Sequence, residues 1–423
     1  MMRPFTAVWR GCDPLLSLIL LGAVSAVVLF ARDLPWRGEW MWTLDWAAGT
    51  TILLGPLTAA VAAYQSARWR ALTIKLLLPT ARRRLAACFT PTVAVLASAT
   101  VVYVIGTVLV LAITSAYHPT DRFQPAEWLI GLTKLGLCAA LGWVLGSRLQ
   151  AYVTASVAVA ACYALTVAAS GSSALAFWRL GGSTGPSSGT VIDDRYTGGA
   201  ALLFIGLSGA LAASFLIQRA PTRRVAQVTA SLSAALATAG LLLCSGPGTT
   251  YSRVDTHPHR LCRGAPVSVC LLAGNTSQLG PWSQLMNQAA GGLQDLGLDG
   301  QTRYEQPAPG PVHAADVGIV FFDPGTINIT PPSHLYVAES LATPATCPAF
   351  ASERPPVQAL NAREWLAQLI VQRVWPDDPS HQDPRVAVWA RTTPIADQNR
   401  WVRMTFAGLR RCALSAIDVP VAS

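Results

Sequence analysis

The chain has 423 residues, of which 52% are hydrophobic and 13% are charged, and its net charge is +9. This composition excludes an ordinary soluble globular protein, in which about a quarter of the residues are charged. The basic excess lies in residues 1–244, which hold 18 Lys/Arg and 8 Asp/Glu. Because that half is also the apolar one, we interpret the excess as a topology signal and a lipid contact, and not as a nucleic-acid surface.

Seven apolar stretches reach the length of about 18 residues with which a helix crosses a bilayer. They run approximately over residues 15–31, 46–64, 92–116, 128–146, 151–169, 199–218 and 225–244. The first is followed by Arg32, Asp33 and Pro35 rather than by a small-residue cleavage site, so we expect it to be a retained anchor. The sequence thus predicts a polytopic α-helical membrane domain over residues 1–244.

A basic connection between the second and third stretches sets the expected orientation. Residues 65–85 carry six basic side chains: Arg68, Arg70, Lys75, Arg82, Arg83 and Arg84. With the amino terminus in the cytoplasm, 12 Lys/Arg lie in the inner segments and 5 in the outer connections. Since Lys and Arg accumulate on the cytoplasmic side, this orientation is favoured. An odd number of spans then places residues 245–423 outside the cytoplasm.

Within that connection, Trp69, Leu72 and Leu76 recur at helical spacing until Pro79 ends the segment. The pattern predicts a short helix on the membrane surface. It would either dock a cytoplasmic subunit or rest on anionic lipid.

Tryptophan is concentrated where the second and fourth spans meet the outer side. The residues are Trp36, Trp40, Trp42, Trp46 and Trp128. Their clustering favours a position at the membrane interface, although core packing explains any single ring equally well.

The fourth span contains Lys134, which shares a helix face with Gly131, Cys138 and Gly142. The ammonium lies about 9 Å below the outer edge of the span, which is near enough to snorkel outward. The alternative is an intramembrane polar site in which Lys134 binds a substrate. Gly142 and Gly146 form a GxxxG pair, and the seventh span has a face of small residues, Ala226, Ala230, Ser233 and Ala237. Both features predict close helix packing.

The polar tail reads as a linker over residues 245–260 and an α/β (α+β) domain over residues 261–423. We predict strands at 267–272 and 317–322, helices at 282–296 and 395–414, and a capping box from Asn361 to Glu364. The tail holds four cysteines: Cys262, Cys270, Cys347 and Cys412. An even number outside the cytoplasm predicts two disulfides, with three possible pairings.

Motifs for catalysis are lacking in the sequence. Its two lysines, Lys75 and Lys134, do not stand in GxxxxGK[ST], and there is no HExxH or GxSxG. We therefore expect neither an enzyme nor a cofactor. His257 and His259, near Asp255 and Cys262, form a weak candidate metal site, with which a disulfide of Cys262 competes.

Over residues 1 to about 218 the pattern resembles the membrane subunit of an ABC-2-type transporter of actinobacteria. The resemblance rests on the basic amino-terminal segment with Arg3 and Arg10, the span containing Leu54-Gly55-Pro56-Leu57, the basic inner loop, and four further spans. The tail, with Cys262-Arg263-Gly264 and Val269-Cys270, is similar to extracytoplasmic domains fused to permease-like proteins. A seventh span and the tail go beyond the six-span pattern of that family.

The resemblance implies a coupling helix for a separate ATPase, formed here by Arg68, Arg70, Leu72, Lys75 and Leu76. It also implies re-entrant helices in the outer segment 174–180, which contains Phe177, Trp178 and Leu180. The implied protein is a multi-pass subunit of a bacterial cell membrane. It would export a hydrophobic or peptide-like substrate, paired with a second copy or with another permease-like subunit. The alternative is a non-transporting anchor or receptor whose outer domain binds a ligand or a partner protein.

Overall fold

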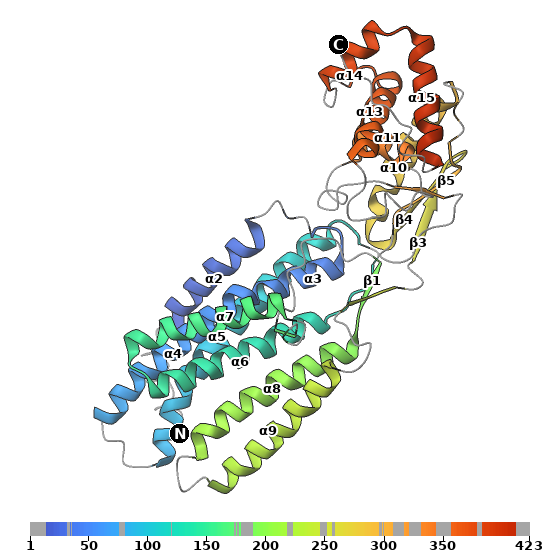
Figure 1. Ribbon diagram of the computed structural model, residues 1–423. Coiled ribbons are helices and arrows are strands. Elements are labelled where there is room, and N and C mark those ends of the chain that lie inside the picture. Colours follow the sequence, from blue (N-terminus) through green and yellow to red (C-terminus); the bar gives the residue numbers. More distant parts are fainter. Residues whose placement is uncertain are drawn as a thin grey trace.

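The chain is mostly helical, with a small sheet in its carboxy-terminal tail, in the computed structural model of the protein (Figure 1). The structure describes residues 14–31, 34, 36–75, 81–119, 121–172, 175, 177–178, 189–217, 223–245, 252–255, 259–295, 298, 300–307, 317–320, 331–343, 357–378 and 383–411. The helices up to Cys244 form one elongated bundle, and the tail lies at one end of it.

The bundle consists of eight apolar helices in the part of the chain that the structure describes. They are α2 (Pro14–Phe30), α3 (Trp40–Gly49), α4 (Thr51–Lys75), α5 (Ala81–Ser115), α6 (Ala126–Arg148), α7 (Ala151–Gly171), α8 (Asp194–Ile217) and α9 (Arg223–Cys244). The carboxyl ends of α4, α6 and α8 lie at the end of the bundle away from the tail (Figure 1).

Five segments among the described residues are long and apolar enough to cross a membrane. They are Trp40–Arg70, Phe89–Ser115, Ala126–Arg148, Asp194–Ser214 and Arg224–Cys244. The first joins α3 and α4, which are separated only at Thr50. The remaining two expected spans coincide with shorter apolar helices, Leu15–Phe30 and Val153–Ala169. All seven expected segments are therefore helical, and five of them meet the length of a span.

Glycines let α4 and α6 approach each other closely. A Cβ added to Gly142 would lie 2.1 Å from the carbonyl oxygen of Ala59, and one added to Gly146 would lie 2.2 Å from that of Ala63. Since no side chain fits between these backbones, the GxxxG prediction of close packing is confirmed. The small-residue face of α9 is confirmed in the same way, because Gly206 of α8 packs directly on Ser233 and Ala237.

The outer tryptophans are mostly core residues. Trp36, Trp42 and Trp46 are at most 7% exposed, and they pack with Leu29 and Val110. For these three rings the interface interpretation is wrong, because α2, α3 and α5 enclose them.

A two-stranded ribbon connects the bundle to the tail. Strand β1 (Thr190–Ile192), just before α8, pairs antiparallel with β2 (Ser252–Val254), which follows α9. The backbone N–H of Asp255 also donates to the carbonyl of Gly189 at 2.9 Å. Residues 245–260, expected to be a plain linker, therefore contain a paired strand.

The tail contains a four-stranded sheet in the order β3-β4-β5-β6. Strand β3 (Arg260–Arg263) is antiparallel to β4 (Ser268–Leu272), while β4, β5 (Arg303–Glu305) and β6 (Gly318–Ile319) are parallel. The predicted strands at 267–272 and 317–322 correspond to β4 and β6, although residues 321 and 322 lie outside the described part. Strands β3 and β5 are not predicted by the sequence pattern, because three or four residues are too few to show a period.

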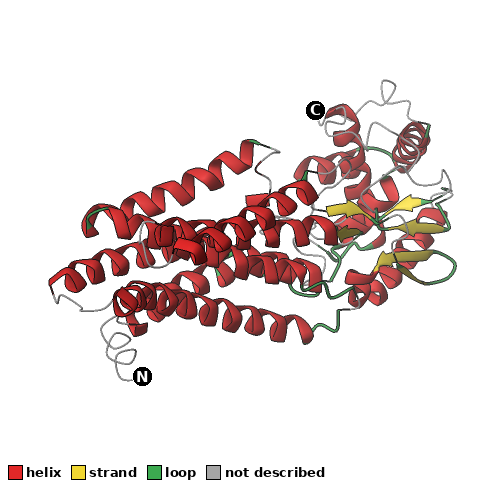
Figure 2. Cartoon of the chain, turned by 90° about the horizontal axis from the view of Figure 1, so that it is seen from below, coloured by secondary structure: helices red, strands yellow, loops and turns green. Residues whose placement is uncertain are grey.

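Helices pack against this sheet (Figure 2). They are α10 (Leu279–Asp295), which follows the 3-10 helix η3 (Ala273–Gln278), and α11 (His334–Ala342), α13 (Val357–Val374), α14 (Pro384–Thr392) and α15 (Ile395–Arg410). The core joins Leu271 of β4 to Met286, Val337, Leu366 and Phe406 of four helices. Two predicted helices are thereby confirmed, and the tail has its own hydrophobic core.

The predicted capping box is wrong. Asn361 and Glu364 lie inside α13, which begins at Val357. Asn361 therefore falls in the second turn, where the backbone N–H groups already have partners within the helix.

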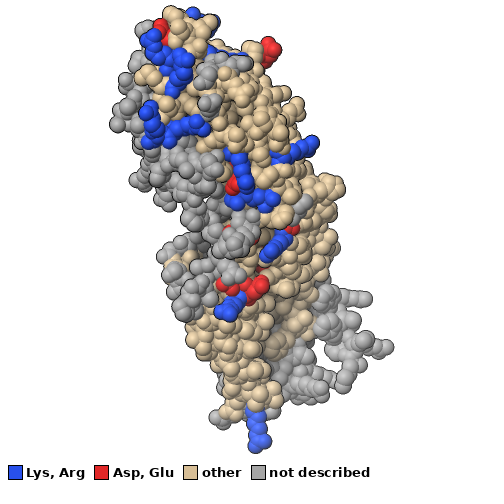
Figure 3. Space-filling model, turned by 90° about the vertical axis from the view of Figure 1, so that its right-hand side faces the viewer, with Lys and Arg blue, Asp and Glu red and all other residues tan. Residues whose placement is uncertain are grey.

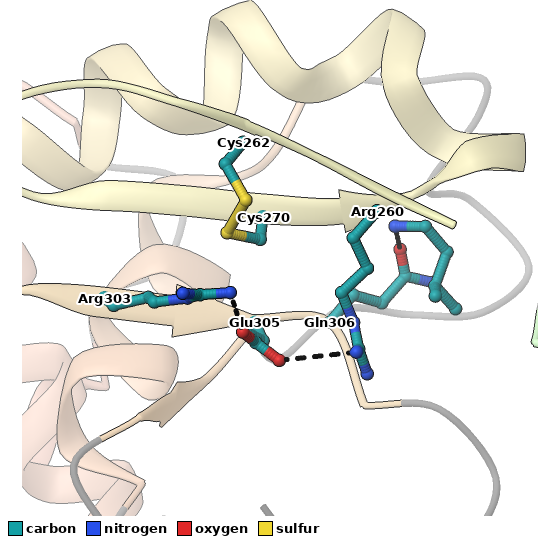
Figure 4. The surroundings of a disulfide bond; sticks show 7 residues. Arg260, Cys262, Cys270, Arg303, Glu305 and Gln306 are labelled. Atoms are coloured by element: carbon teal, nitrogen blue, oxygen red, sulfur yellow. Dashed lines mark hydrogen bonds and ion pairs between the residues drawn. A yellow bond between two sulfur atoms is a disulfide. The ribbon is translucent and has the colours of Figure 1, made fainter. Parts of the chain in front are cut away.

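One disulfide is present among the described residues, between Cys262 and Cys270 (Figure 4). The two cysteines are directly opposite each other on β3 and β4. On the neighbouring strand β5, Glu305 forms ion pairs with Arg303 at 2.5 Å and with Arg260 at 3.5 Å. This pairing selects one of the possible connections. Cys347 and Cys412 lie outside the described residues, so a second disulfide stays a prediction.

We predict that Gly142→Ala destabilises the bundle. Its new methyl group would meet the Ala59 backbone, and overpacking of this kind costs about 1–3 kcal/mol. The melting temperature of the protein in detergent, followed by tryptophan fluorescence, should fall. Gly136→Ala on the same helix is the control, because its Cβ meets nothing within 4 Å. Equal melting temperatures for the two variants would contradict the packing argument.

Removing the disulfide should weaken the tail. Closing a loop with a sequence separation of 8 residues restricts the unfolded chain, so Cys262→Ser with Cys270→Ser should lose about 2 kcal/mol of the free energy of unfolding. Urea denaturation measures this loss. Dithiothreitol should lower the stability of the wild type to that of the double variant and leave the double variant unchanged.

Candidate functional site

The end of the bundle away from the tail carries the basic segment. By backbone position, Arg68, Arg70 and Lys75 lie on the last turns of α4, and Arg148 ends α6. Arg68 is exposed and Arg70 is half-buried. This end therefore presents cations at the ends of at least two neighbouring helices.

Arg70 has a structural role at this end. Its guanidinium donates to the carbonyl of Ser147 at 2.7 Å and to the carbonyl of Leu149 at 2.8 Å. The last carbonyls of a helix lack partners within the helix, so these bonds cap α6. Arg70 thus fixes where α4 and α6 end relative to each other.

The expected surface helix is not separate. Helix α4 runs without a break from Thr51 to Lys75, so Leu72 and Lys75 are part of it, while Leu76 lies outside the described residues. Because Arg70 is level with the end of α6, the five residues after it extend about 7 Å further along the same axis.

Lys134 points into the bundle. It is 2% exposed, and its Nζ donates to the backbone carbonyl of Trp178 at 2.7 Å. The same Nζ lies 5.5 Å from the centre of the Trp178 ring. The expected outward snorkelling is therefore wrong, because a carbonyl dipole and an indole face provide partners inside the protein.

The segment that meets Lys134 is itself fixed by aromatic contacts. The Trp178 indole N–H donates to the hydroxyl of Thr166 on α7 at 3.0 Å, and its ring meets Phe204 of α8 edge-on. Phe177 packs on the same Phe204 ring. Trp178 of the outer segment thus contacts residues of α6, α7 and α8. Leu180 lies outside the described residues, and re-entry of this segment into the membrane stays a prediction.

The side chains nearest to Lys134 on α6 and α7 include two thiols. Cys138, one turn further along α6, and Cys162 of α7 are buried in the same cluster and form no disulfide. Among the described residues, no carboxylate forms an ion pair with Lys134. An ammonium among apolar helices without a counter-charge is expensive, and ionisable residues at such positions commonly serve a function.

Two acids that directly precede the second and fourth predicted spans are buried. Asp45 of α3 and Glu127 of α6 are 4% and 2% exposed, and they lie close enough to each other to interact. Helix spacing is the sequence signal that could have indicated the burial of Glu127, because Glu127 precedes Lys134 by two turns on one face. This face of α6 therefore carries Glu127, Lys134 and Cys138 in a row.

Asp121, in the connection before α6, ties α5 and α6 to α3. Its two carboxylate oxygens accept the backbone N–H groups of Trp40 and Met41, each at 3.0 Å. Burial raises the pKa of Asp121 above its usual value, and these two donors act in the opposite direction. An anion at the first N–H groups of a helix is the favoured arrangement, so Asp121 caps α3.

The weak metal candidate gains no support. His257 lies outside the described residues, His259 is exposed, and Cys262 is consumed by its disulfide. Within the described ranges, no group of three or more His, Cys, Asp or Glu side chains is placed to hold a metal ion.

No protein-family model, curated protein or solved structure matches this chain.

We predict different outcomes for two arginines that lie two residues apart. Arg70→Ala should lower the melting temperature, because two charge-assisted hydrogen bonds to carbonyls, worth about 1.5–3 kcal/mol each, disappear. Arg68→Ala, at an exposed position, should lower the melting temperature clearly less than Arg70→Ala does. A large drop for Arg68→Ala alone would contradict this assignment.

Proposed function

We propose that the chain is the membrane-spanning, permease-like subunit of an ABC-type transporter. It would work with a separate ATPase to export a hydrophobic or peptide-like substrate, paired with a second copy or with another permease-like subunit. The observation that carries the proposal is the basic end of α4, which extends past the turn between α6 and α7. A cationic helix end that projects from a membrane bundle offers a docking surface to a cytoplasmic protein.

The charge distribution supports a membrane position. On the face drawn in Figure 3, the described part of the bundle is almost free of charged side chains, whereas blue and red side chains gather at the junction with the tail and over the tail. Large apolar side chains of α9, including Val225, Leu232 and Leu242, are exposed by at least 61%. Lipid is the solvent that suits such a surface.

The orientation follows from the two ends of the bundle. The basic ends of α4 and α6 lie at one end of the bundle, and Lys/Arg favour the cytoplasmic side. The tail lies at the other end and contains a disulfide, which persists in oxidising compartments outside the cytoplasm. Both observations support an orientation with the amino terminus in the cytoplasm and the tail as an extracytoplasmic domain. The seven spans and the bacterial cell membrane remain part of the proposal.

Lys134 is the polar position that we assign to the transport path. Its Nζ contacts the carbonyl and the ring of Trp178, and an indole face suits an apolar substrate, while the ammonium suits an electronegative group. The position is buried in the structure, so a substrate would have to displace the carbonyl of Trp178.

Purification of the chain from its native membrane tests the proposal. We expect an ATPase to co-purify with the wild type and to be lost from Arg68→Glu combined with Lys75→Glu. Arg70 is left intact because it supports the fold. Arg403→Glu, at an exposed position of the tail, is the matched control and should retain the ATPase.

Two results would contradict the proposal. If no ATPase co-purifies with the wild type, the chain is better described as a non-transporting anchor or receptor whose tail binds a ligand or a partner protein. If charge reversal leaves the ATPase bound, the end of α4 is not its docking surface.

A further inference from the structure

A hollow of about 500 Å³ lies among four helices of the tail. The helices are α10, α13, α14 and α15, which lie together at the far end of the molecule (Figure 1). The apolar part of the lining comes from Leu369, Val374, Ala390 and Ile395, and the polar part includes Arg373 and Gln398. This volume falls within the range of small-molecule sites, which are mostly apolar with a few placed polar groups.

Arg373 is held in one orientation at this hollow. Its Nη1 donates to the side-chain carbonyl of Asn399 at 2.7 Å, and its Nη2 donates to that of Gln398 at 2.9 Å. Gln398 is 4% exposed, and its own amide donates to the carbonyls of Ala390 at 2.6 Å and Thr393 at 2.7 Å. The guanidinium is therefore positioned by a chain of hydrogen bonds that begins at the backbone.

The charge of Arg373 is not compensated by an acid. Its two partners are neutral amides, and in the described part of the chain it forms no ion pair. Partial burial lowers the pKa of Arg373, and no neighbouring carboxylate opposes that effect. A guanidinium has five N–H donors, so three remain after these two bonds.

An arginine that only connects α13 to α15 would not need to lie at an open hollow with unused N–H donors. Two neutral amides provide hydrogen bonds but no counter-charge, and a half-buried cation without one is unfavourable. An anion would supply a counter-charge, and the planar fork of Arg matches the two oxygens of a carboxylate.

We propose that this hollow binds a small organic carboxylate, whose charged group pairs with Arg373 and whose apolar body lies against Leu369, Val374 and Ile395. The site belongs to the tail alone. It does not depend on the transport proposal, because binding is measured without an ATPase.

The test uses the full chain in detergent and two matched probes, 4-tert-butylbenzoate and its neutral amide, 4-tert-butylbenzamide. Isothermal titration calorimetry should show saturable binding of the benzoate and at least tenfold weaker binding of the benzamide. Arg373→Gln should weaken benzoate binding at least tenfold and leave benzamide binding unchanged. Arg403→Gln, which removes an exposed arginine of α15 away from the hollow lining, should bind both probes as the wild type does.

A second variant keeps the test independent of the folding of Arg373→Gln. Ile395→Glu leaves Arg373 in place and adds a competing carboxylate at the first residue of α15, where an acidic side chain suits the helix. It should weaken benzoate binding at least tenfold. Equal affinity of the wild type for both probes, no binding of the benzoate, or unchanged benzoate binding in Ile395→Glu would each overturn the proposal.

Discussion

The close contact of α4 with α6 sets the positions of the other groups in the bundle. Gly55 faces Cys138, Ala59 faces Gly142, and Ala63 faces Gly146, so each step of four residues on one helix matches a step of four on the other. Helices that meet along such rows are fixed in register as well as in distance. The register continues to Arg70, which reaches the last carbonyls of α6, and it places Lys134 about one turn before the Cys138 level. A shift of one turn would separate Arg70 from its acceptors.

The sequence predicted what depends on local pattern and missed what depends on partners. All seven apolar segments and the GxxxG contact followed from composition and spacing. Two glycines four residues apart on an apolar helix lie on one face, where they let a neighbouring helix approach closely. The inward orientation of Lys134 did not follow, since it requires the carbonyl of Trp178, which is 44 residues away. Strand β2 was missed for the same reason, because its partner β1 precedes α8. The capping box failed because Asn361 and Glu364 match a local signature that the start of α13 at Val357 overrides.

The junction of bundle and tail is a constrained connection. Strand pairing of β1 with β2 ties the chain that enters α8 to the chain that leaves α9, and β3 follows within a few residues. The disulfide then fixes β3 to β4, and β4 carries the core of the tail through Val269 and Leu271. The first strand of the sheet is thus linked both to the helices that we assign to the membrane and to the tail core. A movement of α8 against α9 would act on the same ribbon that leads into the tail.

Two cations of this chain have neutral partners, and their surroundings separate their roles. Lys134 is 2% exposed, and its Nζ is already engaged by the carbonyl and the ring of Trp178. Arg373 is only partly buried, lines an open hollow, and retains unused donors beside apolar side chains. Solvent also lowers the energy of a half-buried guanidinium far more than that of an ammonium enclosed by helices. Occupation of the Lys134 site therefore requires a conformational change, whereas the Arg373 site is already formed in the structure.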